Sequence, residues 1–419
     1  MNTRISLIVS ISVVLLMIGC KNGTEDKLVN LYKDSYKGYD KVLSSEMSEI
    51  KTIKNDLTTI PIPLDLKKKK IELDLLVDSV HFVHLETRED ILLGDINRIL
   101  FAEDRIVTLE IFARNIAHIF DREGNFISQL GVQGEGPNEY QEITSAGINH
   151  ARREILLMDV RGRKMMYYDF DGKHLRNERM YFYANSFTVL NDSTILFKQL
   201  SQSNFHIEKL RDHMLYFSDY SCKVHHYSIP SWALRYPQMP KRYIYEDLNH
   251  KDGKALYGAF LNDTIYEISE SGIISSKYYL DLGSNGLMQH MDASTNDDDR
   301  HKLTEKGYYH FDGKCLETDN GLYLKIGEFY HVYYNRSTGG FQYGGNVLYK
   351  SWFGKKMDLI QFKHPIASEG NFFISVTWPD DILRANPDPD EYVPHVADMI
   401  RKAEKDGNPI LSFFTLKDF

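Results

Sequence analysis

The sequence has few cysteines and few prolines. Three of the 419 residues are Cys, and only Cys222 and Cys315 follow Cys20. Two cysteines in a chain of this length do not make a disulfide scaffold, and we expect two unpaired, partly buried thiols. Proline is also sparse, with 12 residues against 27 Tyr and 22 Phe. This composition favours half-buried β-strands over disorder or coiled coil.

Basic residues are outnumbered by acidic ones. The chain has 50 Lys and Arg against 59 Asp and Glu, which gives a formal net charge of −9. Removal of residues 1–19, which contain one Arg and no acid, makes the charge more negative still. Binding to nucleic acid or to anionic lipid headgroups needs a basic surface, so neither is expected as a partner.

Local catalytic and metal-binding motifs are missing from the sequence. There is no His-Glu-x-x-His, no Cys-x-x-Cys and no Gly-x-Ser-x-Gly. His81 and His84 would point to opposite faces of a strand, and so would the neighbours His225 and His226. We therefore assign no catalytic residue, no metal ligand and no cofactor. An enzyme is disfavoured but stays open, because active sites can be assembled from distant segments.

Residues 1–19 are predicted to be a lipoprotein signal peptide. Arg4 is followed by an apolar run over 5–18, which is short for a membrane span. Met17-Ile18-Gly19-Cys20 resembles the lipobox of bacterial lipoproteins, in which the Cys thiol is acylated. Cys20 is thus the predicted lipidation site, and an ordinary signal peptide is the alternative. The expected location is the outer membrane, on its periplasmic or cell-surface face.

Residues 20–70 lack a sustained strand pattern. A short helix is expected over 41–56, where apolar residues recur on one side. Pro61, Pro63 and the basic run over 67–70 then interrupt any regular element. We predict a polar, lipid-anchored tether over 20–70.

A strand-turn-strand unit recurs along the rest of the chain with a period of about 50 residues. It is clearest over 116–127 and 165–175, and weaker copies lie at 264–274 and 330–341. A fixed period in this range, with each unit a β-hairpin, is typical of a propeller. The predicted fold is therefore all-β, a six-bladed β-propeller of four-stranded blades over 71–419. Seven blades are the alternative, because 283–314 has no assigned strand.

The strands expected in each blade follow from the alternation of apolar residues and from turn residues. A strand near 71–85 is expected to close the ring by completing the last blade, which removes exposed sheet edges. The predicted blades are 96–130; 143–179; strands 187–190, 194–198, 206–210 and 223–229; 255–282; 315–343; and finally strands 372–377 and 410–416 with a helix near 393–403.

A family resemblance comes from the segment after the first hairpin. The hairpin over 120–127 is followed by a glycine-rich stretch over 130–140 that ends in Gly-Pro-Asn-Glu-Tyr. This segment resembles the NHL-like six-bladed β-propeller lipoproteins of Bacteroidetes, and so does the ending that begins at 407–411. The resemblance implies a cell-envelope protein and supplies no catalytic residues. The glycines themselves are expected to serve the connection between blades, since no phosphate-loop Lys follows them.

Four polar residues share one position of the repeat, namely Asp121, Asp169, Ser269 and Asn335. Side chains of this kind can bond the turn backbone two residues on, and we favour this interpretation. The alternative is a ring of carboxylates around the channel that holds a cation.

Other candidate residues are acidic or aromatic. The segment 386–391 imitates the start of a calcium loop but lacks its glycine, so a rigid acidic loop is expected there, and a solvated acidic turn at 297–299. Aromatic residues that could line a sugar- or peptide-binding face are Trp232, Trp352, Trp378, Tyr181–Tyr183 and Tyr243–Tyr245.

These observations predict a binding or scaffold module of the cell envelope. The membrane is reached through the N-terminal lipid, and the expected ligands are a glycan, a peptide or an envelope protein, including an outer-membrane uptake complex. The specific ligand-binding residues are unknown at this stage. The alternative function is a metal-assisted propeller hydrolase or lyase with its site at the central channel.

Overall fold

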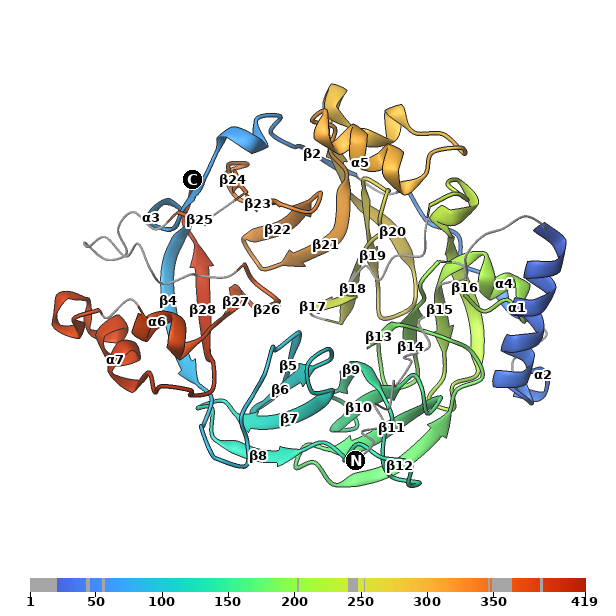
Figure 1. The fold of residues 1–419 in the computed structure, drawn as a ribbon, viewed down its shortest axis with the longest axis horizontal. Coiled ribbons are helices and arrows are strands. Elements are labelled where there is room, and N and C mark those ends of the chain that lie inside the picture. The colour runs from blue at the N-terminus through green and yellow to red at the C-terminus, as the bar shows by residue number, and fades with distance from the viewer. Residues whose placement is uncertain are drawn as a thin grey trace, which may run out of the picture.

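The computed structural model describes residues 21–42, 46–54, 57–201, 203–239, 248–251, 253–345, 347–348, 364–384 and 387–419. Six β-sheets stand around a central axis, each with the strands of one blade (Figure 1). The first strands of the blades contact one another in sequence order around the ring. The predicted six-bladed, all-β propeller is confirmed.

Blades 1 and 2 have the predicted strands. Blade 1 consists of β5 (Arg98–Ala102), β6 (Arg105–Glu110), β7 (Ile116–Asp121) and β8 (Phe126–Gln129), and blade 2 of β9 (Ile143–Asn149), β10 (Glu154–Asp159), β11 (Lys164–Asp169) and β12 (His174–Arg179). Successive residues of β6 face different blades, since Ile106 packs with blade 6 and Val107 with blade 2. Burial on both faces explains why the middle strands are almost continuously apolar.

Blade 3 corrects one prediction. It contains β13 (Ser186–Val189), β14 (Ile195–Lys198), β15 (His213–Ser218) and β16 (Val224–Pro230). The strand predicted over 206–210 is wrong, because these residues lead into the short helix α4 (Glu208–Arg211). Asn204, with a φ of 55°, turns the chain there, and its amide donates to the Tyr183 carbonyl and to Gln199 Oε1.

Blades 4 and 5 lie near their predicted ranges, and no seventh blade lies between them. Their strands are β17 (Asn249–Lys251), β18 (Lys254–Gly258), β19 (Thr264–Ile268) and β20 (Ile274–Asp281), then β21 (Phe311–Glu317), β22 (Gly321–Ile326), β23 (Tyr330–Asn335) and β24 (Phe341–Gly344). The predicted range 255–282 misses the first strand of blade 4, which begins at Asn249. The connection between the blades forms η3 (Gly283–Asn285), η4 (Leu287–His290) and α5 (Asp297–Glu305).

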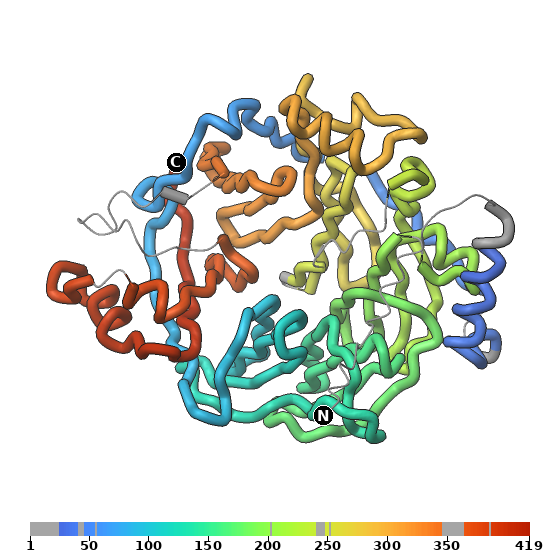
Figure 2. Tube along the Cα trace, in the orientation of Figure 1, coloured from blue at the N-terminus to red at the C-terminus, as the bar shows by residue number. Residues whose placement is uncertain are grey.

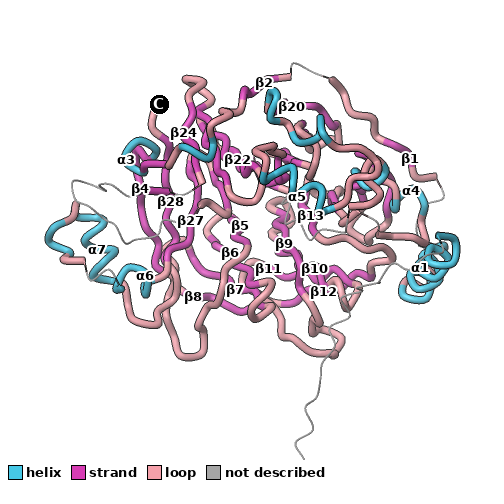
Figure 3. The backbone as a smooth tube through the Cα atoms, turned by 45° about the horizontal axis from the view of Figure 1, so that its top comes forward, coloured by secondary structure: helices cyan, strands magenta, loops and turns pink. Residues whose placement is uncertain are grey.

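Blade 6 joins the two ends of the propeller. Its strands are β26 (Ala367–Glu369), β27 (Phe372–Thr377), β28 (Ile410–Leu416) and the N-terminal β4 (Val77–His84), which pairs antiparallel with β28. The predicted closure is confirmed. The predicted helix is α7 (Pro394–Lys402), which follows α6 (Pro379–Arg384) and η5 (Pro389–Glu391). Both α-helices lie outside the ring of strands (Figure 3).

The N-terminal segment runs around the rim of the propeller (Figure 2). It forms α1 (Lys21–Ser35), α2 (Tyr39–Val42), β1 (Ser48–Glu49), β2 (Thr58–Pro61), η1 (Leu66–Lys68), β3 (Ile71–Glu72) and α3 (Leu73–Leu76). β1 and β2 pair in parallel with β16 and β20, and β3 pairs with β25 (Val347–Leu348).

The helix predicted over 41–56 is therefore wrong, since α2 ends at Val42 and a strand follows. The short rim strands were also missed: Ile60 and Leu66 are fully buried although most of their neighbours are exposed. The role of this segment as a lipid-anchored tether stays a prediction.

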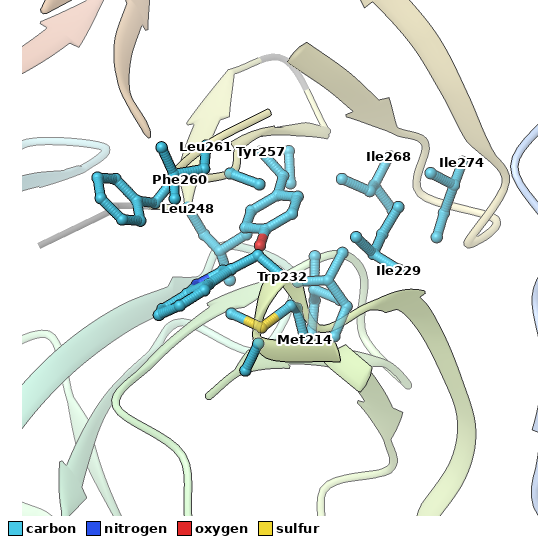
Figure 4. Packing of buried hydrophobic residues seen from close by; sticks show 14 of the residues in the cluster. Met214, Ile229, Trp232, Leu248, Tyr257, Phe260, Leu261, Ile268 and Ile274 are labelled. Carbon is cyan, nitrogen blue, oxygen red and sulfur yellow. The ribbon is translucent and has the colours of Figure 1, made fainter. Parts of the chain in front are cut away.

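Apolar side chains fill the spaces between blades. Figure 4 shows the cluster between blades 3 and 4, where Met214 and Ile229 of blade 3 face Tyr257 and Ile268 of blade 4. Cys222 and Cys315 are not joined in a disulfide, as predicted, but both are fully buried, and the prediction was of partial burial. Packing of this kind makes the inner strands a rigid frame for whatever lies on the axis.

Candidate functional site

The two ends of the propeller differ in the length of their connections. Because the strands of a blade are antiparallel, the turns after the first and third strands lie at one end, which we call the hairpin end. The remaining connections lie at the opposite end, called the loop end, and they include α4, α5, α6 and α7. Rigid scaffolds commonly carry binding residues on such loops and on the strand ends beside them.

The inner strands enclose a cavity of about 310 Å³ on the axis. Five blades contribute to its wall, through residues that include Arg98, Ile148, Thr188, Leu248 and Ser368. Its size lies at the lower end of the range for small-ligand sites, roughly 300–1,000 Å³. The axis of the ring is thus the place where polar side chains distant in sequence come together.

Arg98 lies at the loop end of this cavity, at the first position of β5. Its Nη1 donates to Ser145 Oγ at 2.6 Å, and its Nη2 donates to the Leu248 carbonyl at 3.4 Å. Leu248 immediately precedes β17 of blade 4, which lies opposite blade 1 in the ring. The guanidinium therefore reaches across the axis, and only 6% of the residue is exposed.

Glu369 lies at the hairpin end of the same cavity, at the end of β26. Arg122 binds it with two hydrogen bonds of 2.7 Å each, so its charge is compensated. The Arg122 guanidinium also stacks on Phe101, three residues after Arg98 in β5. At about 3.3 Å per residue, the Cα atoms of Arg98 and Phe101 lie roughly 10 Å apart along the strand.

The four repeat residues form turns and do not surround the channel. The backbone amides of Asn125 and Lys173 donate to the carboxylates of Asp121 and Asp169, each at 2.8 Å. Ser269 accepts the corresponding bond from the Ile273 amide in blade 4, and Asn335 accepts from the amides of Ser337 and Thr338 in blade 5. All of these turns join the third and fourth strands of a blade, away from the axis. The turn interpretation is confirmed, and the ring of carboxylates is wrong.

Blade 3 has the same turn residue, which the sequence analysis missed. Asp219 accepts hydrogen bonds from the amides of Ser221 and Lys223. The sequence contains this Asp, but Cys222 stands where the other turns have Gly, so the turn was not recognised. Asp219 also binds His225 at 3.0 Å, while His226 contacts Ser48. The two adjacent histidines thus have separate partners, as their alternation on a strand predicts.

The described aromatic residues that were predicted to line a binding face differ in exposure. Trp232 is only 9% exposed and packs edge-to-face on Phe260 at 5.6 Å (Figure 4). Trp378 packs against the cluster between blades 1 and 6, and Phe182 in the Tyr181–Tyr183 segment is buried. Trp232 and Phe182 therefore serve packing between blades. Tyr181, Tyr183 and Trp378 are partly exposed, and their contact with a ligand stays a prediction. Trp352, Tyr243–Tyr245 and Cys20 lie outside the described residues.

The two acidic motifs cap helices. Asp297–Asp299, predicted as a solvated turn, form the first turn of α5, where Asn296 and Asp299 make a reciprocal capping box. Carboxylates are favourable there because the helix dipole is positive at its N-terminus. Asp388 accepts from the Asp390 amide and so caps η5. In the described part of the chain, no three His, Cys, Asp or Glu side chains converge on one point.

Asp263, at the loop end, has a carboxyl group with a raised pKa. It follows β18, and its Oδ1 is buried without a hydrogen-bond partner. Burial raises the pKa of Asp263 from 3.8 to about 7, and the nearby Asp281 adds to this effect. The folded state therefore holds the proton more tightly than the unfolded state, so stability falls as the pH rises from about 4 to 7.

Asp263→Asn is expected to remove this pH dependence, because the amide cannot ionise. The free energy of unfolding of the variant should exceed that of the wild type by about 1–3 kcal/mol at pH 8. At pH 4 the two free energies should be nearly equal. Urea unfolding at both pH values measures this, with Asp192→Asn at an exposed turn as the control. An equal gain at both pH values would show that folding does not raise the pKa of Asp263.

Comparison with known structures supports the fold. The chain is similar to a putative exported protein of Bacteroides fragilis, with a TM-score of 0.65 and 16% identity over 86% of this chain and 99% of that one. A DUF4221 family member from Bacteroides vulgatus aligns with a TM-score of 0.44 and 13% identity over 82% and 97% of the two chains. No curated protein matches the sequence.

Within the part of the chain that the structure describes, none of the helices has the length and apolar character needed to cross a membrane.

A comparison with models of protein families shows to which family the chain belongs. The family model described as "Domain of unknown function (DUF4934)" matches residues 57–415, which cover the rim strand β2 and all six blades. The chain therefore belongs to the DUF4934 family.

Proposed function

We propose that the protein is a binding module of the cell envelope that takes part of its ligand into the cavity on the propeller axis. The observation that carries this proposal is the cavity itself, about 310 Å³ in volume and walled by five blades. A volume of this size admits a sugar unit or a short peptide segment, while the loops beside it can contact the rest of a larger partner. The similarity to an exported protein supports a place in the envelope.

The N-terminal helix supports a particular placement at the membrane. In this proposal Cys20 is acylated, as in the NHL-like lipoproteins that the sequence resembles, and α1 begins one residue later. Arg163 donates to the Ser35 carbonyl at 2.6 Å, and Arg211 pairs with Glu25 at 3.0 Å. These contacts fasten α1 to blades 2 and 3, so the lipid would hold the rim of these blades close to the outer membrane.

Filling the cavity tests the proposal. Ser368 lies on β26 and lines the cavity, so a Trp at this position would occupy much of its volume. The wild-type protein and Ser368→Trp are compared by isothermal titration against a panel of glycan fragments and short peptides. We expect a ligand of the wild type to lose at least about tenfold in affinity with the variant, because it competes with the indole for one space.

Ser284→Trp is the matched control, since Ser284 is exposed on the connection after blade 4. It should bind like the wild type. If Ser368→Trp also binds like the wild type, the ligand does not use the cavity. Elemental mass spectrometry of the dialysed protein tests the alternative function: one retained calcium or zinc per chain would favour a metal-assisted hydrolase or lyase.

A further inference from the structure

Arg98 is a buried cation without a counter-charge in the described part of the chain. Its two hydrogen bonds go to a hydroxyl and a carbonyl, and no carboxylate lies within ion-pair distance. A buried charge that lacks a partner is costly, because the protein interior replaces its water shell poorly. Nothing in the fold requires this residue type at the start of β5, since the remaining blades have other residues at the starts of their inner strands.

A second buried arginine shows how this chain pairs such a group when its role is structural. Arg300 of α5 is fully buried, and it pairs with Asp297 at 2.8 Å and with Glu328 at 3.3 Å. Arg98 has no equivalent of either carboxylate. Among the described residues that line its cavity, the acidic one is Glu369, and Arg122 binds it at the hairpin end. Within the described part of the chain, the positive charge at the loop end of the cavity therefore has no carboxylate partner.

Hydrogen-bond donors beside Arg98 are also unused. A guanidinium has five N–H donors, and Arg98 uses two of them within the protein. Ser145 Oγ accepts from Arg98 and from the Phe187 amide at 3.3 Å, so its own proton is left for a third group. The Thr188 side chain lines the same cavity and makes no hydrogen bond to any described residue.

From this combination we infer that the ligand of the cavity carries an oxyanion, a carboxylate or a sulfate, that binds to Arg98. The inference rests on the proposed binding function and names the chemistry of its ligand. Carboxylate and sulfate groups have several acceptor oxygens in a geometry that matches the fork of a guanidinium. Thr188 of blade 3 lines the same cavity, and Ser145 of blade 2 contacts Arg98 directly, so both hydroxyl groups can add to the set of donors.

The first experiment measures anion binding by the wild-type protein. Thermal unfolding is followed with sulfate, phosphate, acetate or glucuronate added at constant ionic strength, with chloride as the reference. We expect a saturable rise in Tm of about 2–5 °C with at least one of these anions. The sulfate and glucuronate arms distinguish a sulfated ligand from an acidic sugar. If none of the four raises the Tm above chloride, the inference is overturned.

The second experiment removes the cation. Arg98→Gln keeps a donor but not the charge, and we expect affinity for the effective anion to fall roughly 10- to 100-fold. Without anion the variant should unfold at the wild-type temperature or above it, because it no longer buries an unpaired charge. Arg384→Gln is the control, since this arginine is exposed on α6 and pairs only with Asp381. Full anion binding by Arg98→Gln would overturn the inference.

Two further variants keep the test decisive. If Arg98→Gln does not fold, Thr188→Val removes one donor with little change of shape and should weaken anion binding several-fold. The cavity-filling variant Ser368→Trp separates the two proposals. If a ligand loses affinity for Ser368→Trp but not for Arg98→Gln, the inference that the ligand carries an oxyanion is overturned. The proposal that the cavity binds a ligand would still hold.

Discussion

Gly124→Ala is expected to destabilise the propeller by about 3 kcal/mol or more. Gly124 has a φ of 92°, a conformation that costs an L-residue about 1–2 kcal/mol. A Cβ at this position would also collide with the backbone carbonyl of His84, the last residue of β4. Backbone cannot move aside as a flexible side chain does, so overpacking adds about 1–3 kcal/mol to the cost.

The turn at Gly124 matters because it touches the strand that closes the ring. The Gly124 carbonyl accepts a hydrogen bond of 2.8 Å from the Glu86 amide, just after β4. A displaced turn would therefore disturb the junction between blades 1 and 6. Urea denaturation followed by circular dichroism measures the change in the free energy of unfolding.

Gly339→Ala is the matched control. Gly339 occupies the corresponding turn of blade 5 with a φ of 76°, but no atom lies within 4 Å of the position its Cβ would take. Only the backbone term remains, so a loss of about 1–2 kcal/mol is expected. Equal losses in the two variants would show that crowding against His84 contributes nothing.

Phe414→Ala is expected to cost about 3–5 kcal/mol, as large core truncations do. Phe414 is completely buried on β28, opposite Val80 of β4, and packs near Phe373 of β27 with the ring centres 5.8 Å apart. The cavity left by the ring would lie at the joint between the two chain ends. Hydrogen exchange should therefore speed up in β4 more than in blades 2 and 3.

The control for this variant is Phe329→Ala, at a loop position that is 65% exposed. Its unfolding free energy should stay within about 0.5 kcal/mol of the wild type. If Phe414→Ala loses equally little unfolding free energy, or if hydrogen exchange speeds up to the same extent in all blades, packing at Phe414 does not hold β4 in the ring.

The blades could be predicted where turn chemistry and strand alternation agree. In blade 2, Asp169 and Gly172 mark the hairpin between the third and fourth strands, and the alternation of apolar residues indicates the other strands. Blade 3 lacks that agreement, because Cys222 and not Gly stands at the positive-φ position of its turn, with a φ of 60°. Without a visible turn, the apolar residues near 206–210 were assigned to a strand.

The rim strands and the cavity were not predictable for a different reason. β1 and β3 have two residues each, too few to show alternation, and their partners lie far along the chain. Arg98 begins β5, whereas the predicted strand began at residue 96 and included Arg98 as one charged residue among apolar ones. Its contact with Leu248 spans 150 positions and depends on the closure of the whole ring. The central channel itself was predicted, but its charge was not.

The pairing of β4 with β28 sets the order in which the chain can reach its final form. Ser79 and Thr415 share a hydrogen bond of 2.8 Å across 336 positions. Synthesis begins at the N-terminus, so β4 remains without its partner strand until residues 410–416 have been made. Contacts of such long range also form slowly. The edge of β4 is thus unpaired throughout this interval, and synthesis that stops before residue 410 would leave an open, aggregation-prone ring.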